Sequence, residues 1–287
     1  MAELNDWTCE FNGLVMGEPD SPISIVAVDG LLTLPEVRTS DLTLVQRHGL
    51  YAGDDYLGGR TVTMTLEVYG STREEFTDAL TSVQAAFTLG TETAFRFRFP
   101  GAAADQTAYV MARCRKRSAP LDLNFANRVC NVAVELFATQ PYILGDAARE
   151  VTVRSSVRET QDGGLKFPAT MPFTIVAPSA PPPDPVARFR QYGSIAARPV
   201  ITVTSASNPT LHDDVTKAWF SVAYSGSFSI DSAAEHVYDS RGNDITGSVL
   251  NGSTWPEYRP GDHRLRLVHG DSLTQATAVL SWVDRWV

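Results

Sequence analysis

The residues in this sequence that could do chemistry are two short acidic groups and five scattered histidines. Asp54 and Asp55 lie in a glycine-rich segment that runs from Gly53 to Arg60. A catalytic carboxylate dyad shares a proton between its two groups, but adjacent residues on a strand point to opposite sides. Both aspartates are therefore more simply interpreted as solvated turn residues.

His212 is followed directly by Asp213 and Asp214, which raises the question of a metal site. No second histidine stands at a metal-ligand spacing, so a loop between strands is the simpler interpretation. The sequence has no nucleophile elbow, no Ser/His/Asp order and no phosphate-binding glycine loop. We expect no catalytic residue, no metal and no cofactor, and thus no enzyme. The weakest alternative is a cell-wall hydrolase that uses Asp54, Asp55 or His212.

Composition narrows the class of protein further. The chain has 287 residues, 43% of them apolar and 20% charged, which predicts packed globular domains. A formal net charge of −9 argues against a sequence-specific nucleic-acid binder, which needs a basic footprint. The sequence offers neither a run of about 18 apolar residues nor a signal peptide, so we expect no membrane insertion and folding in a cytoplasm.

The three cysteines, Cys9, Cys114 and Cys130, are odd in number and widely spaced. This pattern favours buried thiols over a disulfide framework or a zinc site.

The elements expected in residues 1–142 are strands with one main helix. Apolar and polar residues alternate from Thr61 to Val68, which predicts a half-buried strand. Ser71 has capping-box spacing to Glu74, and an amphipathic helix follows, with the apolar stripe Phe76, Leu80, Val83 and Phe87. Alternation also predicts strands around 95–99, 110–115 and 130–136. We predict an α+β domain in which the helix covers one sheet face.

Residues 143–287 are predicted to be a second, all-β domain. Short strands at intervals of about 8–12 residues are typical of a β-sandwich or jelly roll. Five prolines fall within residues 177–185, which excludes a helix or central strand there and predicts an extended loop or linker at 178–185. The fold class expected for the whole chain is mainly β.

Two surfaces are candidates for binding. Arg113, Arg115 and Arg117 would line one strand face; with Lys116, Arg96 and Arg98 they could dock acidic partners. The alternative is a solvated face or a charged sheet edge that blocks unwanted pairing. In the second domain, Trp255 and Tyr258 could stack on sugars, although such aromatics are more often core or interface residues.

The order of short motifs along nearly the whole chain resembles the distal tail protein (Dit) family of siphovirus-type phages of Gram-positive hosts, including actinobacteria. The motifs that carry the resemblance are Asp6-Trp7, Phe11-Asn12-Gly13-Leu14, Val28-Asp29-Gly30-Leu31, Gly53-Asp54-Asp55, Gly58-Gly59-Arg60, Pro120-Leu121-Asp122, Gln140-Pro141-Tyr142, Ala197-Arg198-Pro199, Trp255-Pro256, Arg259-Pro260-Gly261-Asp262 and Trp282-Val283-Asp284-Arg285-Trp286.

The resemblance implies a belt domain at 1–142 that closes into a hexameric ring, and a galectin-like β-sandwich at 143–287. Such a ring joins the tail tube to the tail-tip hub and lets DNA pass. The implied partners are the chain itself, the tail tube protein, the tail-tip hub (tail-associated) protein and the tape measure protein. The implied location is the virion tail tip, with assembly in the host cytoplasm.

On this interpretation the candidate subunit or partner contacts are Asp54, Asp55, Tyr56, Arg60, Arg113 and Arg115. The alternative function is a carbohydrate-binding module that recognises host cell-wall sugars through its C-terminal sandwich, with Trp255 and Tyr258 as the contacts.

Overall fold

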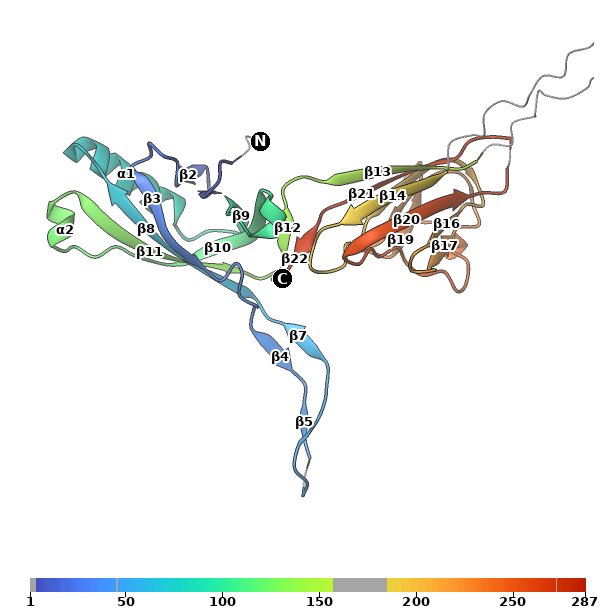
Figure 1. Ribbon diagram of the computed structural model, residues 1–287, viewed down its shortest axis with the longest axis horizontal. Helices are drawn as coiled ribbons and strands as arrows, with labels where there is room; N and C mark the ends of the chain where they lie inside the picture. Colours follow the sequence, from blue (N-terminus) through green and yellow to red (C-terminus); the bar gives the residue numbers. More distant parts are fainter. Residues whose placement is uncertain (1–3, 45, 157–184, 272) are drawn as a thin grey trace, which may run out of the picture. The chain divides into compact units, whose positions relative to one another are not determined.

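The computed structural model describes residues 4–44, 46–156, 185–271 and 273–287 (Figure 1). These residues form 22 strands and only two α-helices, so the expected mainly β fold is confirmed. They divide into two compact units. The first unit comprises the chain up to Ala147 together with 193–195 and 284–287, and the second comprises 148–192 and 196–283. Apart from Pro185, the expected proline-rich loop lies outside the described residues.

A nine-stranded sheet is the frame of the first unit. Its main path runs in the order β2-β1-β9-β10-β11-β8-β3, while β12 pairs with β10 and β22 pairs with β12. The strands are β1 (Thr8–Phe11), β2 (Leu14–Met16), β3 (Ile23–Asp29), β8 (Arg60–Tyr69), β9 (Thr93–Arg98), β10 (Ala108–Ser118), β11 (Val129–Ala138), β12 (Ile143–Gly145) and β22 (Arg285–Trp286).

Helix α1 (Arg73–Ala86) covers one face of this sheet with Phe76, Ala79, Val83 and Ala86. Alternate residues of β8 and β11 are buried on the same face, which is why both strands alternate in sequence. A short helix α2 (Leu123–Ala126) and a 3₁₀ turn (Ala103–Asp105) complete the helical content of this unit.

The expected helix cap is displaced by one residue. The N-cap is Thr72, whose hydroxyl accepts from the Glu75 amide at 3.1 Å, and the Ser71 hydroxyl instead donates to the Glu75 carboxylate at 2.6 Å. Both Ser71 and Thr72 have a glutamate three residues later, so the motif alone did not select between them. Burial of Phe76 and Ala79 sets the helix register.

A narrow arm, residues 32–59, leaves the sheet between β3 and β8 (Figure 1). It is built from two consecutive pairs of short antiparallel strands: β4 (Val37–Thr39) with β7 (Asp55–Leu57), and β5 (Leu42–Thr43) with β6 (Leu50–Tyr51). All described residues from Glu36 to Tyr56 are exposed, so the arm has no core of its own.

The second unit is a β-sandwich with one shared core. Its five-stranded sheet has the order β13-β21-β15-β18-β19, and its four-stranded sheet has the order β14-β20-β16-β17. Ile201, Phe228 and Leu280 from the first sheet and Leu211, Phe220 and Leu265 from the second belong to one buried cluster. The strands are β13 (Arg149–Arg154), β14 (Val186–Gln191), β15 (Val200–Ser207), β16 (Thr210–Asp213), β17 (Trp219–Ser221), β18 (Ser225–Asp231), β19 (His236–Asp239), β20 (Gly261–Val268) and β21 (Thr277–Trp282); a 3₁₀ turn covers Thr246–Ser248.

All three cysteines are free and buried, as expected. Burial raises the pKa of the Cys9 thiol far above its ordinary value. Within the described residues, no helix has the length and apolar character needed to span a membrane.

Candidate assembly interface and binding pocket

Arg60 holds the base of the arm. Its side chain is almost fully buried; Nε donates to the Pro141 carbonyl at 2.8 Å, and Nη1 donates to the carbonyls of Leu31 at 3.1 Å and Thr33 at 3.0 Å. A further Nη1 contact reaches the Gly30 carbonyl. Burial lowers the pKa of this guanidinium. The structure therefore places this candidate contact residue inside the unit, where it orients the arm.

Two glycines allow the chain to pass closely at this base. Gly30 has φ +91°, and a Cβ there would lie 2.1 Å from the Thr61 carbonyl oxygen. A Cβ on Gly59 would lie 2.4 Å from the Phe137 ring. Any side chain at either position would displace the start of the arm, because backbone or ring atoms block it.

The outer arm carries apolar side chains that are exposed to solvent. Leu42 is 67% exposed, Leu50 59%, and Tyr51 67%. Asp54 lies before β7 and Asp55 begins it, opposite Thr39, so Asp55 belongs to a strand rather than to the turn expected. Tyr56 is 59% exposed beside them. An isolated two-stranded ribbon with an exposed apolar surface is only marginally stable in water.

The sheet itself has two open margins. Strand β3 pairs with β8 on one side, and from Ser24 to Asp29 its other side pairs with no strand of the described chain. Strand β10 pairs with β9 only as far as Ala112, so from Arg113 to Ser118 its only partner strand in the described part of the chain is β11, on one side. These two margins bound the four strands β10-β11-β8-β3 at opposite ends. Open backbone groups of this kind are templates for another strand.

The two margins differ in charge. Arg113, Arg115 and Lys116 are exposed on the β10 margin, and the Arg115 guanidinium lies 3.5 Å from the centre of the Phe137 ring. The β3 margin ends at the exposed Asp29, with the exposed Glu67 on the next strand.

The expectation that Arg117 shares the face of Arg113 is wrong. A β-bulge at Arg115 shifts the register between β10 and β11, so Arg117 lies opposite the buried Val134 and on the α1 side of the sheet. Its Nη1 donates to the carbonyls of Gln84 at 2.6 Å and Phe87 at 3.0 Å, at the end of α1. A cation at this position also suits the negative end of the helix dipole.

Arg96 and Arg98 are not part of the basic margin either. Arg96 is buried; its Nε and Nη2 donate to the Asp146 carboxylate at 3.2 and 2.7 Å, and its Nη1 reaches Glu10. The hydrogen bonds that Arg96 donates to the Asp146 carboxylate are the main cause of the raised pKa of Arg96. Arg98 pairs with Asp6 at 2.8 Å. Both cations serve internal ion pairs of the first unit.

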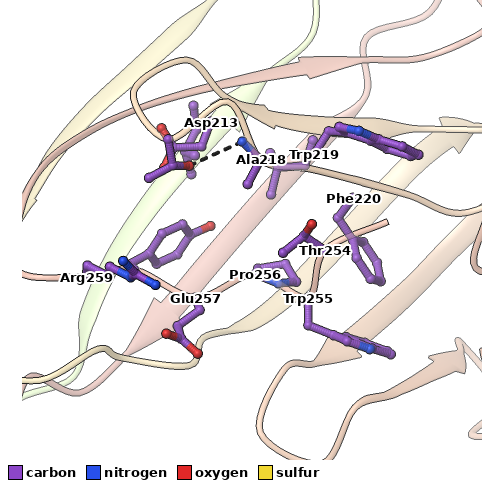
Figure 2. A pocket seen from close by; sticks show the side chains of 13 residues that line it. Asp213, Ala218, Trp219, Phe220, Thr254, Trp255, Pro256, Glu257 and Arg259 are labelled. Atoms are coloured by element: carbon purple, nitrogen blue, oxygen red, sulfur yellow. Dashed lines mark hydrogen bonds between the residues drawn. The ribbon is translucent and has the colours of Figure 1, made fainter. Parts of the chain in front are cut away.

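The second unit contains a pocket of about 420 Å³ (Figure 2). Strands β16 and β17 and residues 254–259 supply most of its lining. Trp219 and Trp255 are half-buried, and Trp255 packs on Phe220 with ring centres 4.8 Å apart. Tyr258 is only 2% exposed, so its ring is covered by its own unit, whereas Trp255 remains partly accessible.

A buried histidine–aspartate pair lies beside this pocket. His263 Nδ1 is 2.8 Å from Asp213 Oδ2, and His263 Nε2 is 2.8 Å from the Arg259 carbonyl oxygen. Burial acts to raise the pKa of Asp213, but hydrogen bonds from His263, the Val215 amide and Thr216 outweigh it and keep that pKa below its ordinary value. The His263 ring is thus held between the Asp213 carboxylate and the Arg259 carbonyl. The arrangement stabilises the fold and offers no nucleophile.

Sequence reasoning missed three of these features. The bulge at Arg115 leaves no residue signature. The His263–Asp213 pair joins residues 50 positions apart, and only the pairing of β16 with β20 brings them together. The position of Trp219 in the pocket depends on the loop that returns at Thr254, whose amide donates to the Trp219 carbonyl.

Together, the sheet with one covering helix, the projecting arm and the β-sandwich define a two-unit, mainly β architecture. No protein-family model and no curated protein matches the chain. Among solved structures, it is similar to the SPP1 Dit protein (gp 19.1), described as a paradigm of the hub adsorption apparatus in phages that infect Gram-positive bacteria. The two share 14% identity with a TM-score of 0.62, and the match covers 98% of this chain and 99% of that one.

Chains of the phage P2 baseplate in its activated conformation, with Ca and with Sr, match at 7% identity with TM-scores of 0.44 and 0.43; the matches cover 96% of this chain and 97% and 96% of those chains. The fold is thus that of the SPP1 Dit protein over nearly the full length of both chains, as the motif order predicted. At 14% identity this likeness concerns the fold.

Proposed function

We propose that the chain is a structural protein of a phage tail tip and that its first unit assembles head to tail into a closed ring. The observation that carries this proposal is the pair of open sheet margins, on β10 with the exposed Arg113, Arg115 and Lys116, and on β3 with the exposed Asp29 at its end. A basic margin cannot pair favourably with itself, but it complements the acidic margin of a second copy. Contacts between two different surfaces of one chain generate rings or filaments.

The arm supports the same arrangement. Its exposed leucines and tyrosines are apolar side chains whose burial would be favourable, and a neighbouring subunit or an adjoining tail protein would bury them. Tyr56, Asp54 and Asp55 are then arm contacts, and Arg60 acts by orienting the arm.

In the fuller form of the proposal the ring has six copies, joins the tail tube to the tail-tip hub and leaves a lumen for DNA. The fold shared with the SPP1 Dit protein supports this role. The tape measure protein, the tail tube protein and the hub protein are the proposed neighbours, in a virion assembled in the host cytoplasm. The net charge of −9 suits a lumen that does not hold passing DNA.

Charge exchange at the margins tests the proposal. Arg113→Glu with Lys116→Glu places acid against acid and abolishes the ring, as measured by native mass spectrometry and negative-stain imaging. Adding Asp29→Arg and Glu67→Arg to the same chain restores a basic-to-acidic contact and the six-lobed ring. Arg73→Glu, on the exposed start of α1, is the matched control and leaves assembly unchanged.

A wild-type chain that stays monomeric at high concentration, alone and with tail-tube and hub proteins, contradicts the proposal. Rings that persist in the doubly acidic variant contradict the assignment of the margins.

A further inference from the structure

The pocket of the second unit contains a polar group that its own unit leaves unused. The Tyr258 hydroxyl is buried, and within the described residues it has no hydrogen-bond partner. Its ring is held edge-on by Phe189 and by His263, at centre distances of 5.0 and 5.1 Å. The hydroxyl is therefore fixed in place, although an unpaired buried hydroxyl costs stability.

Aromatic rings and charged groups occupy different sides of this pocket. Figure 2 shows Trp219, Phe220 and Trp255 on one side, and Glu257 and Arg259 on the other. Both tryptophans are only half-buried, so part of each ring is accessible.

These charged groups exclude a purely apolar occupant. Glu257 pairs with Arg198 at 3.6 Å, and the Asp213 carboxylate also borders the pocket. An apolar side chain that filled the space would remove water from these ion pairs without replacing its hydrogen bonds. The charges on the rim have both signs, so the pocket favours neither an anion nor a cation.

A saccharide satisfies all of these conditions. A pyranose ring has an apolar C–H face for the tryptophans and a rim of hydroxyls that donate to carboxylates and accept from guanidinium and tyrosine groups. A volume of about 420 Å³ is within the range of small-ligand sites. We propose that this pocket binds one or two sugar rings, stacked on Trp219 and Trp255 and hydrogen-bonded to the Tyr258 hydroxyl.

Titration of the full chain with cellobiose, N,N′-diacetylchitobiose and lactose tests the proposal, followed by tryptophan fluorescence and saturation-transfer NMR. We expect at least one disaccharide to bind with a Kd of about 1 mM. Trp255→Ala weakens that binding by about tenfold or more. Trp7→Ala, which removes an exposed tryptophan of the first unit, is the control and leaves the affinity unchanged.

Tyr258→Phe separates binding from folding. If the hydroxyl serves a ligand, its removal weakens sugar binding by about fivefold and leaves Tm unchanged or raised, because no internal hydrogen bond is lost. A lowered Tm with unchanged affinity assigns the hydroxyl to the fold and overturns the proposal.

Absence of response to all three sugars at about 20 mM, well above the expected Kd, also overturns it. So does binding of indole, an apolar probe, in place of any sugar. Because the pocket lies within the second unit, the Arg113→Glu, Lys116→Glu chain retains sugar binding even where it forms no ring. The failure of either proposal is thus distinguishable from the failure of the other.

Discussion

The two units differ in the kind of surface that they leave open, which is strand backbone in the first unit and a pocket in the second. In the first, what is open is backbone: one side of β3, the outer half of β10 and the strands of the arm. In the second, two sheets enclose one core, and what is open is a pocket lined in part by Tyr258, whose buried hydroxyl has no partner among the described residues. Another strand can complete the first kind of surface, and a small molecule can complete the second. On the two proposals, assembly is a property of the first unit and ligand recognition a property of the second.

Shortening the arm is expected to have the largest effect. Replacing residues 40–54 by Asn-Gly keeps the β4–β7 pair as a two-residue hairpin and removes the exposed apolar tip. Ring yield falls by more than about tenfold, because the tip supplies contact area, while Tm of the monomer changes little. Native mass spectrometry and calorimetry measure the two quantities. Leu89→Ser, at a residue 84% exposed outside the arm, leaves the yield unchanged; a full ring yield after shortening would rule out the arm as an interface.

The second-largest effect is expected when the buried Asp213–His263 pair of the second unit is broken. Asp213→Asn leaves His263 facing a group that is no longer an anion and lowers the free energy of unfolding by about 3 kcal/mol at pH 7. Because the pKa of Asp213 is lowered in the folded state, this stabilisation is present above about pH 4 and is lost as pH falls further.

Urea unfolding at several pH values therefore gives a difference between wild type and variant that shrinks below about pH 4. Ring formation is unaffected at pH 7, since the change lies in the other unit. A constant difference down to pH 2 would contradict the role assigned to the Asp213 carboxylate.

Arg60→Met tests the base of the arm. The change leaves several carbonyls without their donor, so the first unit loses about 2–3 kcal/mol and the arm becomes sensitive to protease. Arg38→Met, on the exposed arm, is the comparison and costs less than about 0.5 kcal/mol. Equal stability of the two variants would show that Arg60 does not hold the arm.

The smallest effect concerns the helix cap. Thr72→Ala removes the hydroxyl that accepts from the Glu75 amide and lowers the free energy of unfolding by about 1 kcal/mol. Thr77→Ala, inside the exposed face of the same helix, stays within about 0.5 kcal/mol. A larger loss of unfolding free energy for Thr77→Ala than for Thr72→Ala would contradict the assignment of Thr72 as the N-cap of α1.

The sequence predicts this fold well where a pattern is local. Alternation along β8 and β11 and the apolar stripe of α1 specify which face each buries, because side-chain direction follows the backbone period. It predicts much less where residues meet across the fold. The bulge that reverses Arg117 depends on the register against β11, and the Asp213–His263 pair depends on β16 lying beside β20. From the sequence alone, the exposed apolar residues of the arm cannot be distinguished from the buried apolar residues of an ordinary strand.

Strand β22 makes the first unit depend on residues that follow the second unit in the sequence. Arg285 and Trp286 pair with β12, and the Asp284 carbonyl accepts from the Gly145 amide at 3.0 Å. The sandwich is therefore an insertion, in chain order, between two pieces of the unit that precedes it. During translation the first unit therefore lacks strand β22 until residues 284–287 have been synthesised, after the whole of the second unit.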